Sequence, residues 1–130
     1  MKTLTIFWQR LVKNGQTCDR CGGTALELQK AIDRLMSALA PLGFEPRLDT
    51  QQIDEPTFSS SPLESNRIWI AGIPLEDWLG ARVGASRCCA ACGDSDCRTV
   101  SVNGRTFETI PAELIVEAAL AAAAQLSART

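Results

Sequence analysis

The chain has 130 residues and a mass of 14.0 kDa, enough for one compact domain spanning residues 1–130. Hydrophobic residues make up 45% and charged residues 22%, a balance typical of a globular protein with a buried core. Thirteen basic and fifteen acidic residues give a net charge of −2 with no basic stripe, so neither nucleic acid nor polybasic membrane attachment is expected. The chain has six cysteines and no histidine, and the absence of histidine excludes Cys–His pairs, Ser–His triads and histidine-ligated metal sites.

The first residues of the chain do not have the form of a secretory signal. Gln9, Arg10 and Lys13 interrupt the apolar residues too early. No stretch approaches the roughly 20 apolar residues that a membrane-spanning helix needs. We therefore predict a cytoplasmic location, where thiols stay reduced, and six cysteines there favour redox chemistry or metal binding over a disulfide framework.

The first half of the chain predicts a strand–helix–strand unit followed by a loop. Residues 4–11 are apolar and β-branched and predict a buried strand. Thr24 and Glu27 form a capping-box pattern before an amphipathic helix that ends ahead of Pro41. Residues 44–53 predict a second strand, and residues 54–66, with two prolines and four serines, predict a loop.

The second half predicts a strand at 67–71, a turn at 72–74 and a short helix through 75–79. Residues 80–96 show no periodicity. Residues 99–110 predict a hairpin turning at Asn103-Gly104, and Pro111 opens an Ala-rich last helix. Small side chains would allow that helix to pair with a second copy in a homodimer, although alanine's helix propensity explains the same composition. The element order predicts the α/β class, with one mixed central sheet and helices on both faces.

Cys18 and Cys21 form a C-x-x-C motif between the first strand and the first helix. Amides and the helix dipole stabilise a thiolate at such a junction, and the second thiol can release an attacked partner. If the helix begins at Thr24, both cysteines precede the positive end of the dipole; if Gly22-Gly23 belong to the first turn, the helix reaches back to Cys18. The motif favours redox chemistry over incidental thiols or half of a zinc site.

The other four cysteines, Cys88, Cys89, Cys92 and Cys97, lie within ten residues of the segment 80–98. They are compatible with a structural zinc, with redox-active disulfides, or with capture of a thiophilic metal ion. Adjacent Cys88 and Cys89 are awkward as ligands of one ion. Spacing alone leaves metal and disulfide open, and we slightly favour redox-active thiols over a metal site.

Several segments resemble a prokaryotic thioredoxin-like family whose name carries no function. They are Trp8–Leu11, Thr17–Cys21, Ser65-Asn66, Gly72–Glu76, the Cys88–Asp94 element with Cys97–Thr99, Asn103-Gly104, Glu108–Pro111 and Leu114-Ile115. The resemblance implies a single thioredoxin-like domain in which Cys18 attacks and Cys21 resolves, with a Cys-rich insertion before the last hairpin. Thioredoxins carry a cis-proline before the third strand, whereas this chain has Ser65-Asn66 there, with Pro62 upstream and Pro74 after the strand.

Three hypotheses follow. The first is a thiol–disulfide oxidoreductase without a cofactor, acting on a protein or small-molecule disulfide through Cys18 and Cys21, with the second cysteine group as a relay. The second is a protein that binds a soft metal or metalloid ion through Cys88, Cys89, Cys92 and Cys97. The third is a redox-inert module in which those four cysteines hold a structural zinc.

Overall fold

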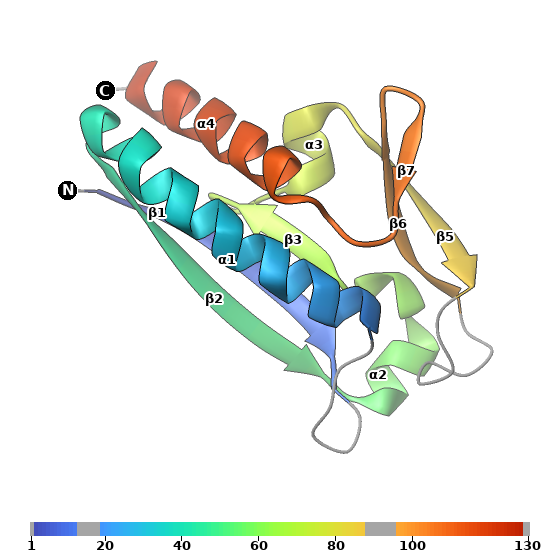
Figure 1. Cartoon of the computed structure of the whole chain (residues 1–130). Helices are drawn as coiled ribbons and strands as arrows, with labels where there is room; N and C mark the ends of the chain where they lie inside the picture. Colours follow the sequence, from blue (N-terminus) through green and yellow to red (C-terminus); the bar gives the residue numbers. More distant parts are fainter. Residues whose placement is uncertain (1, 13–18, 88–95, 129–130) are drawn as a thin grey trace.

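The computed structural model describes residues 2–12, 19–87 and 96–128 (Figure 1). Its longer elements are β1 (Lys2–Leu11), α1 (Asp19–Leu39), β2 (Phe44–Ile53), β3 (Arg67–Ile70), β5 (Arg82–Arg87), β6 (Asp96–Val102) and α4 (Ala112–Ala128). The shorter ones are α2 (Glu55–Ser60), β4 (Ile73–Pro74), α3 (Leu75–Leu79), β7 (Arg105–Phe107) and the 3₁₀ turns η1 (Ala40–Leu42) and η2 (Pro62–Glu64). None of the described helices is both long and apolar enough to cross a membrane.

The strands form two sheets, and the larger one has the order β2-β1-β3-β4. β1 and β2 pair in parallel from Lys2 opposite Phe44 to Leu11 opposite Ile53. Parallel neighbours need a crossover, and α1 supplies it, so the first half of the chain is a βαβ unit as the sequence predicts. β3 then runs antiparallel to β1, and β4 runs antiparallel to β3.

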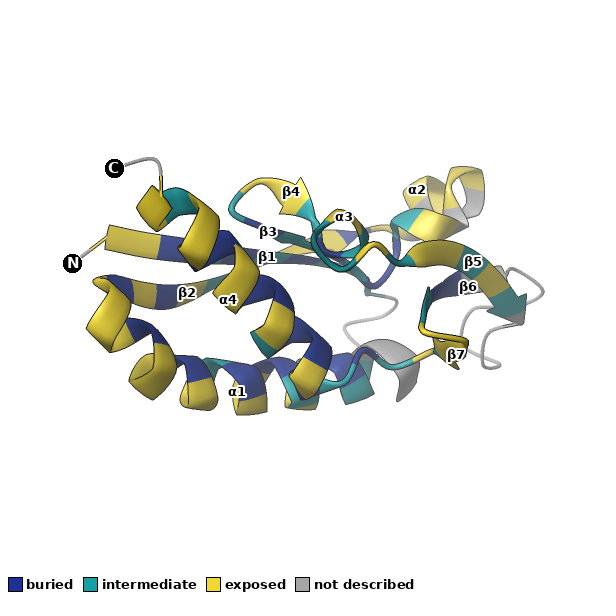
Figure 2. Ribbon diagram, turned by 90° about the horizontal axis from the view of Figure 1, so that it is seen from above, coloured by how far each residue is buried: buried dark blue, intermediate teal, exposed yellow. Residues whose placement is uncertain are grey.

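The two long helices, α1 and α4, pack side by side against one face of this sheet (Figures 1 and 2). Alternate β1 residues Leu4, Ile6 and Trp8 are buried on that face. α4 approaches α1 closely because its contact face is made of alanines, and four of them are fully buried: Ala118, Ala119, Ala122 and Ala123. The alanine-rich composition thus serves contacts within the chain, and a homodimer through this helix stays a prediction.

The opposite face of the four-stranded sheet carries no long helix in the described part of the chain. Phe7 and Trp69 are only partly buried there, and their rings meet edge to face with centroids 5.3 Å apart. The Arg67 guanidinium lies 4.5 Å from the Trp69 ring centroid. Both long helices therefore cover the face on which Leu4, Ile6 and Trp8 are buried, and they do not lie on opposite faces as the sequence predicts.

The smaller sheet has the order β5-β6-β7 and lies beyond α3, away from the first sheet (Figure 1). The predicted hairpin is confirmed, since Val100 pairs with Phe107 and Val102 with Arg105 across Asn103-Gly104. It belongs to a second sheet, however, and not to the single central sheet that the sequence predicts. Part of the segment 80–96, which the sequence predicts to be irregular, forms β5. Its backbone groups pair with β6, and this pairing does not require a periodic pattern of side chains.

The structure corrects one local prediction and decides between the two alternatives for the start of the first helix. The predicted loop at 54–66 contains α2 and η2, and Asp54 caps α2 by accepting a hydrogen bond from the Thr57 amide at 2.9 Å. The first helix begins at Asp19, five residues before Thr24, so Gly22 and Gly23 lie inside it. The described residues contain no cis peptide bond, so none of their prolines reproduces the cis-proline of thioredoxins.

Candidate functional site

The structure describes only two of the six cysteine positions. Cys18, Cys88, Cys89 and Cys92 lie outside the described residues, so their predicted roles stay predictions. For Cys21 and Cys97 the structure describes the backbone alone. Cys21 is the third residue of α1, in its first turn, and Cys97 stands on β6 directly opposite Ser86 of β5.

The start of α1 is held against the segment Glu108–Ile110, which precedes α4. A Cβ atom added to Gly23 would lie 2.9 Å from Thr109 Oγ1 and 3.0 Å from its Cγ2, so only glycine allows this approach. At the next residue, Thr24 Oγ1 accepts a hydrogen bond from the Ile110 amide at 3.2 Å. Gly23, the second residue after the C-x-x-C motif, therefore allows the beginning of α1 to lie close against this segment.

The predicted capping box has a different role in the structure. Thr24 and Glu27 lie inside α1 and cannot cap it. Glu27 Oε1 instead accepts a hydrogen bond from the Ala112 amide, the first residue of α4, at 3.0 Å. Lys30 donates to the other Glu27 oxygen at 2.8 Å, and this bond, followed by that from Ala112, lowers the pKa of Glu27. Glu27 thus supplies to α4 the acceptor that its exposed N-terminal amides need.

The same segment also contacts the second sheet. Ser86 on β5 donates a hydrogen bond to Glu108 Oε1 at 3.1 Å. Because Ser86 pairs with Cys97, the segment Glu108–Ile110 connects the strand pair that carries Cys97 with the helix turn that carries Cys21. Figure 1 shows the beginning of α1 and the adjoining ends of β5 and β6 at the same end of the molecule.

Asn66 joins this segment to the larger sheet. It is buried, adopts the left-handed region with φ of 59°, and immediately precedes β3. Its Oδ1 accepts from Trp8 Nε1 at 3.0 Å, and its Nδ2 donates to the Glu108 carbonyl at 3.2 Å. Asparagine tolerates left-handed backbone better than most residues, which explains why it can occupy this position. Ser65-Asn66 matched the resembled family, but nothing in the sequence indicated its partners.

A buried ion pair fixes β6 to the rest of the chain. Arg98, the residue after Cys97, donates from Nη2 to Glu76 Oε1 at 2.5 Å and from Nη1 to the Leu63 carbonyl at 2.8 Å. Burial lowers the pKa of Arg98, and the adjacent Glu76 carboxylate opposes that shift. On the other side of η2, Glu64 accepts hydrogen bonds from Gln9 and Arg67. The turn η2 thus connects β1, β3 and β6.

These contacts form a frame that joins the start of α1, which carries Cys21, to the strand β6, which carries Cys97. Within residues 2–12, 19–87 and 96–128, no group of three candidate side chains could hold a metal ion, and no cysteine side chain belongs to the described part. The sequence located the cysteines but did not predict the residues of the frame: Asn66, Glu76, Arg98, Glu108 and Thr109.

Comparisons with known proteins identify the family of this chain. A family model described as a domain of unknown function (DUF2703) matches residues 4–119. The chain belongs to the DUF2703 family. An uncharacterized protein of Archaeoglobus fulgidus is 45% identical over 112 residues, which cover 86% of this chain and 82% of that protein. No solved structure matches the chain. The DUF2703 match runs from β1 into α4, so both cysteine groups lie inside the family domain.

Proposed function

We propose that this DUF2703 protein is a cytoplasmic, thioredoxin-like thiol–disulfide oxidoreductase. The observation that carries the proposal is the placement of Cys21 in the first turn of α1, the crossover helix between parallel β1 and β2. A C-x-x-C motif at a βαβ unit is typical of thioredoxin-like redox proteins. Because α1 begins at Asp19, Cys18 directly precedes the helix in sequence, which removes the objection that the motif precedes the helix by several residues.

The proposed reaction is an exchange of disulfides. The Cys18 thiolate attacks one sulfur of a substrate disulfide, forming a mixed disulfide and releasing the other sulfur as a thiolate. The Cys21 thiolate then attacks Cys18, releasing the reduced substrate and leaving a Cys18–Cys21 disulfide. The substrate gains two electrons that the protein loses, and an external dithiol returns them. The positive end of the α1 dipole favours the thiolate form of both cysteines.

The second cysteine group would act as the relay between this motif and that dithiol. The hydrogen bonds of Glu108 and Ile110 support this arrangement, because they attach the β5–β6 pair and the start of α1 to one short segment. Cys88, Cys89 and Cys92 lie in sequence between β5 and β6. A dithiol formed among them and Cys97 would reduce the Cys18–Cys21 disulfide by the same exchange chemistry.

Metal binding is the competing function, and the density of four cysteines in ten residues favours it. The same four thiolates would hold a soft metal or metalloid ion for transfer, or a zinc ion that serves the fold alone. In either case Cys18 and Cys21 need no catalytic part. The two functions therefore differ in which cysteines matter.

The test combines thiol chemistry with metal analysis on the full chain. Reduction of an insulin disulfide is measured for the parent protein, for Cys18→Ser, for Cys21→Ser and for the triple variant Cys88→Ser/Cys89→Ser/Cys92→Ser. Mass spectrometry after alkylation counts free thiols, and elemental analysis measures bound metal. Arsenite titration of the reduced protein probes thiophilic binding.

We expect Cys18→Ser to abolish reductase activity and Cys21→Ser to accumulate a mixed disulfide. We expect the triple variant to keep one turnover of exchange but to lose recycling by the relay. Unchanged activity in Cys18→Ser would overturn the proposal. Stoichiometric zinc that shields the second group from alkylation, without reductase activity, would establish the structural role instead. Tight arsenite binding that only the triple variant loses would establish ion binding.

A further inference from the structure

The outer edge of β5 differs from the other three sheet edges. Sheet edges are usually short, or carry charges and proline that prevent pairing with another strand. β4 has two residues and β7 three, while β2 carries Pro46, Arg47 and Asp49 along its length. β5 has six residues, and its inner four, Val83 to Ser86, contain neither charge nor proline.

The outer edge of β5 is an edge of its sheet in the described part of the chain. β5 pairs with β6 on one side and has no strand on the other among the described residues. Arg82, Val83 and Ala85 are exposed, and β5 packs principally on β6. A six-residue strand spans about 20 Å, long enough for an added strand to pair along several residues.

The charge around β5 indicates what would bind there. Residues 80–107 carry four arginines against two aspartates, whereas the rest of the chain carries nine basic against thirteen acidic residues. Arg98 is already neutralised by Glu76, but Arg82 makes no ion pair with any described residue. The second sheet is thus a basic region of an acidic protein, and its free guanidinium lies at the start of β5.

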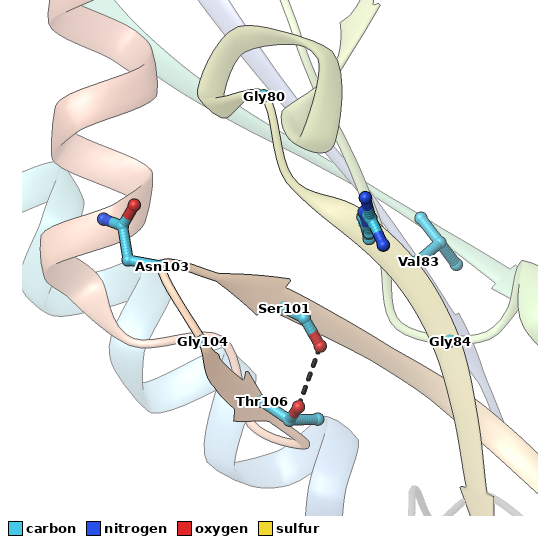
Figure 3. Close-up of a pocket in the computed structure, with 8 residues that line it drawn as sticks. Gly80, Val83, Gly84, Ser101, Asn103, Gly104 and Thr106 are labelled. Atoms are coloured by element: carbon cyan, nitrogen blue, oxygen red, sulfur yellow. Dashed lines mark hydrogen bonds between the residues drawn. The ribbon is translucent and has the colours of Figure 1, made fainter.

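A cavity of about 470 Å³ adjoins Arg82 (Figure 3). Arg82, Ser101 and Thr106 supply polar groups to its lining, together with Asn103, and glycines line part of it. Ser101 and Thr106 share a hydrogen bond of 2.8 Å, so their hydroxyls present polar groups on the same face as Arg82, which stands opposite Ser101. Hydroxyl groups beside an unpaired guanidinium form a suitable environment for a carboxylate.

We propose that β5 binds an extended acidic polypeptide as an added antiparallel strand, with a carboxylate at its C-terminal end in the cavity beside Arg82. An antiparallel strand brings its C-terminal end to the first residue of β5. Residues directly opposite each other share a face of the sheet, so an aspartate paired with Arg82 points to the same side as its guanidinium. This binding needs no cysteine and goes beyond the proposed exchange reaction.

A second copy of the chain fits this edge poorly. A symmetric antiparallel pair of β5 strands would place Arg82 of one copy opposite Arg87 of the other, at both ends of the pairing. Like charges directly opposite destabilise a strand pair. Charge complementarity therefore favours an acidic partner over self-association.

The test uses ¹⁵N-labelled, reduced full-length protein and short peptides followed by NMR amide shifts. The probe is acetyl-Thr-Val-Thr-Val-Thr-Asp-amide, and its neutral match ends in Asn-amide. A third peptide ends in a free carboxylate without Asp, which distinguishes the chain terminus from a side chain as the source of the anion. Two N-methylated forms of the probe, methylated at alternate backbone nitrogens, block pairing through one or the other edge of the peptide.

We expect saturable shifts in residues 82–87 and none in β2, residues 44–53. The neutral peptide should bind about fivefold more weakly, the upper range for a cross-strand charge pair. One N-methylated form should lose binding and the other keep it. Arg82→Gln should remove the preference for the acidic peptide, whereas Arg105→Gln, an equal change of charge on β7, should keep it.

Three results would overturn the proposal: no shifts at millimolar peptide, equal shifts in β2 and β5, or equal binding of both methylated forms. A preference for the acidic peptide that survives in Arg82→Gln would overturn the role of the cavity. Because Arg82 is exposed, we expect Arg82→Gln to keep the fold, and the amide spectrum of the free variant checks this.

Discussion

The ion pair between Arg98 and Glu76 gives the sharpest test of how the second sheet is attached. Only 6% of the Arg98 side chain and 12% of the Glu76 side chain are exposed. Arg98→Met leaves the Glu76 carboxylate buried without its cation and the Leu63 carbonyl without its donor. Removing one partner of a buried pair costs about 3–5 kcal/mol, a large share of the roughly 5–15 kcal/mol that stabilises a typical domain.

The double variant Arg98→Met/Glu76→Leu separates the ion pair from the loss of each side chain. It leaves no buried charge, so we expect its free energy of unfolding to exceed that of Arg98→Met, with a coupling of about 2 kcal/mol. The matched control is Arg47→Met, which breaks an exposed pair with Asp49 whose side chains are 66% and 40% accessible. Such a pair contributes about 0–1 kcal/mol.

Urea unfolding at pH 7 under reducing conditions, followed by tryptophan fluorescence, measures these differences. At a urea dependence of about 1–3 kcal/mol per molar, the midpoint of Arg98→Met should fall by about 2 M. The midpoint of Arg47→Met should move by less than about 0.5 M. If Arg98→Met and Arg47→Met lose the same stability, the ion pair between Arg98 and Glu76 does not hold β6 in place. The same conclusion follows if the double variant loses the sum of what Arg98→Met and Glu76→Leu lose separately.

Three further predictions concern the contacts that join α1, α4 and β3 to the segment Glu108–Ile110 and its neighbours. Asn66→Ala leaves Trp8 Nε1 without an acceptor and places at left-handed φ an alanine, which tolerates it less well than asparagine, so it should lose about 2–4 kcal/mol in urea unfolding. Asn66→Gly also lacks the acceptor but is free of the backbone strain and should lose less, so equal losses would contradict the strain argument. The pKa of Glu27 is lowered by its hydrogen bonds, first with Lys30 and then with Ala112, so its stabilising contribution is present above the unfolded pKa and disappears as pH falls through the folded one. The difference in stability between the parent protein and Glu27→Gln should therefore persist at pH 7 and vanish in unfolding experiments well below pH 4.5, and a difference unchanged by acid would refute it. Gly23→Ala should lower the melting temperature despite a gain in helix propensity of about 1 kcal/mol, and adding Thr109→Ala should restore stability because it removes the two atoms nearest to the new Cβ. If thermal unfolding shows that the effects of the two substitutions simply add, that result would count against the close approach.

Local patterns predicted the elements whose reasons are themselves local. The strand and helix preferences of residues 2–53 gave the βαβ unit, and Asn103-Gly104 gave the hairpin, because turn geometry and hydrophobic period depend on near neighbours. The Thr24-x-x-Glu27 pattern was misleading for the same reason. Its residues were recognised correctly as acceptors, but their donors are the amides of Ile110 and Ala112, far away in sequence.

The sequence alone determined the chemistry available to this protein: six thiols, no imidazole, and a C-x-x-C motif at a strand–helix junction. Tertiary structure decided how the elements that carry Cys21 and Cys97 are joined to the rest of the chain. The division into two sheets, the buried Arg98–Glu76 pair and the position of Asn66 follow from contacts between residues separated by 22 to 58 positions. Such contacts depend on which elements share the limited space around the core, and no local pattern encodes that choice.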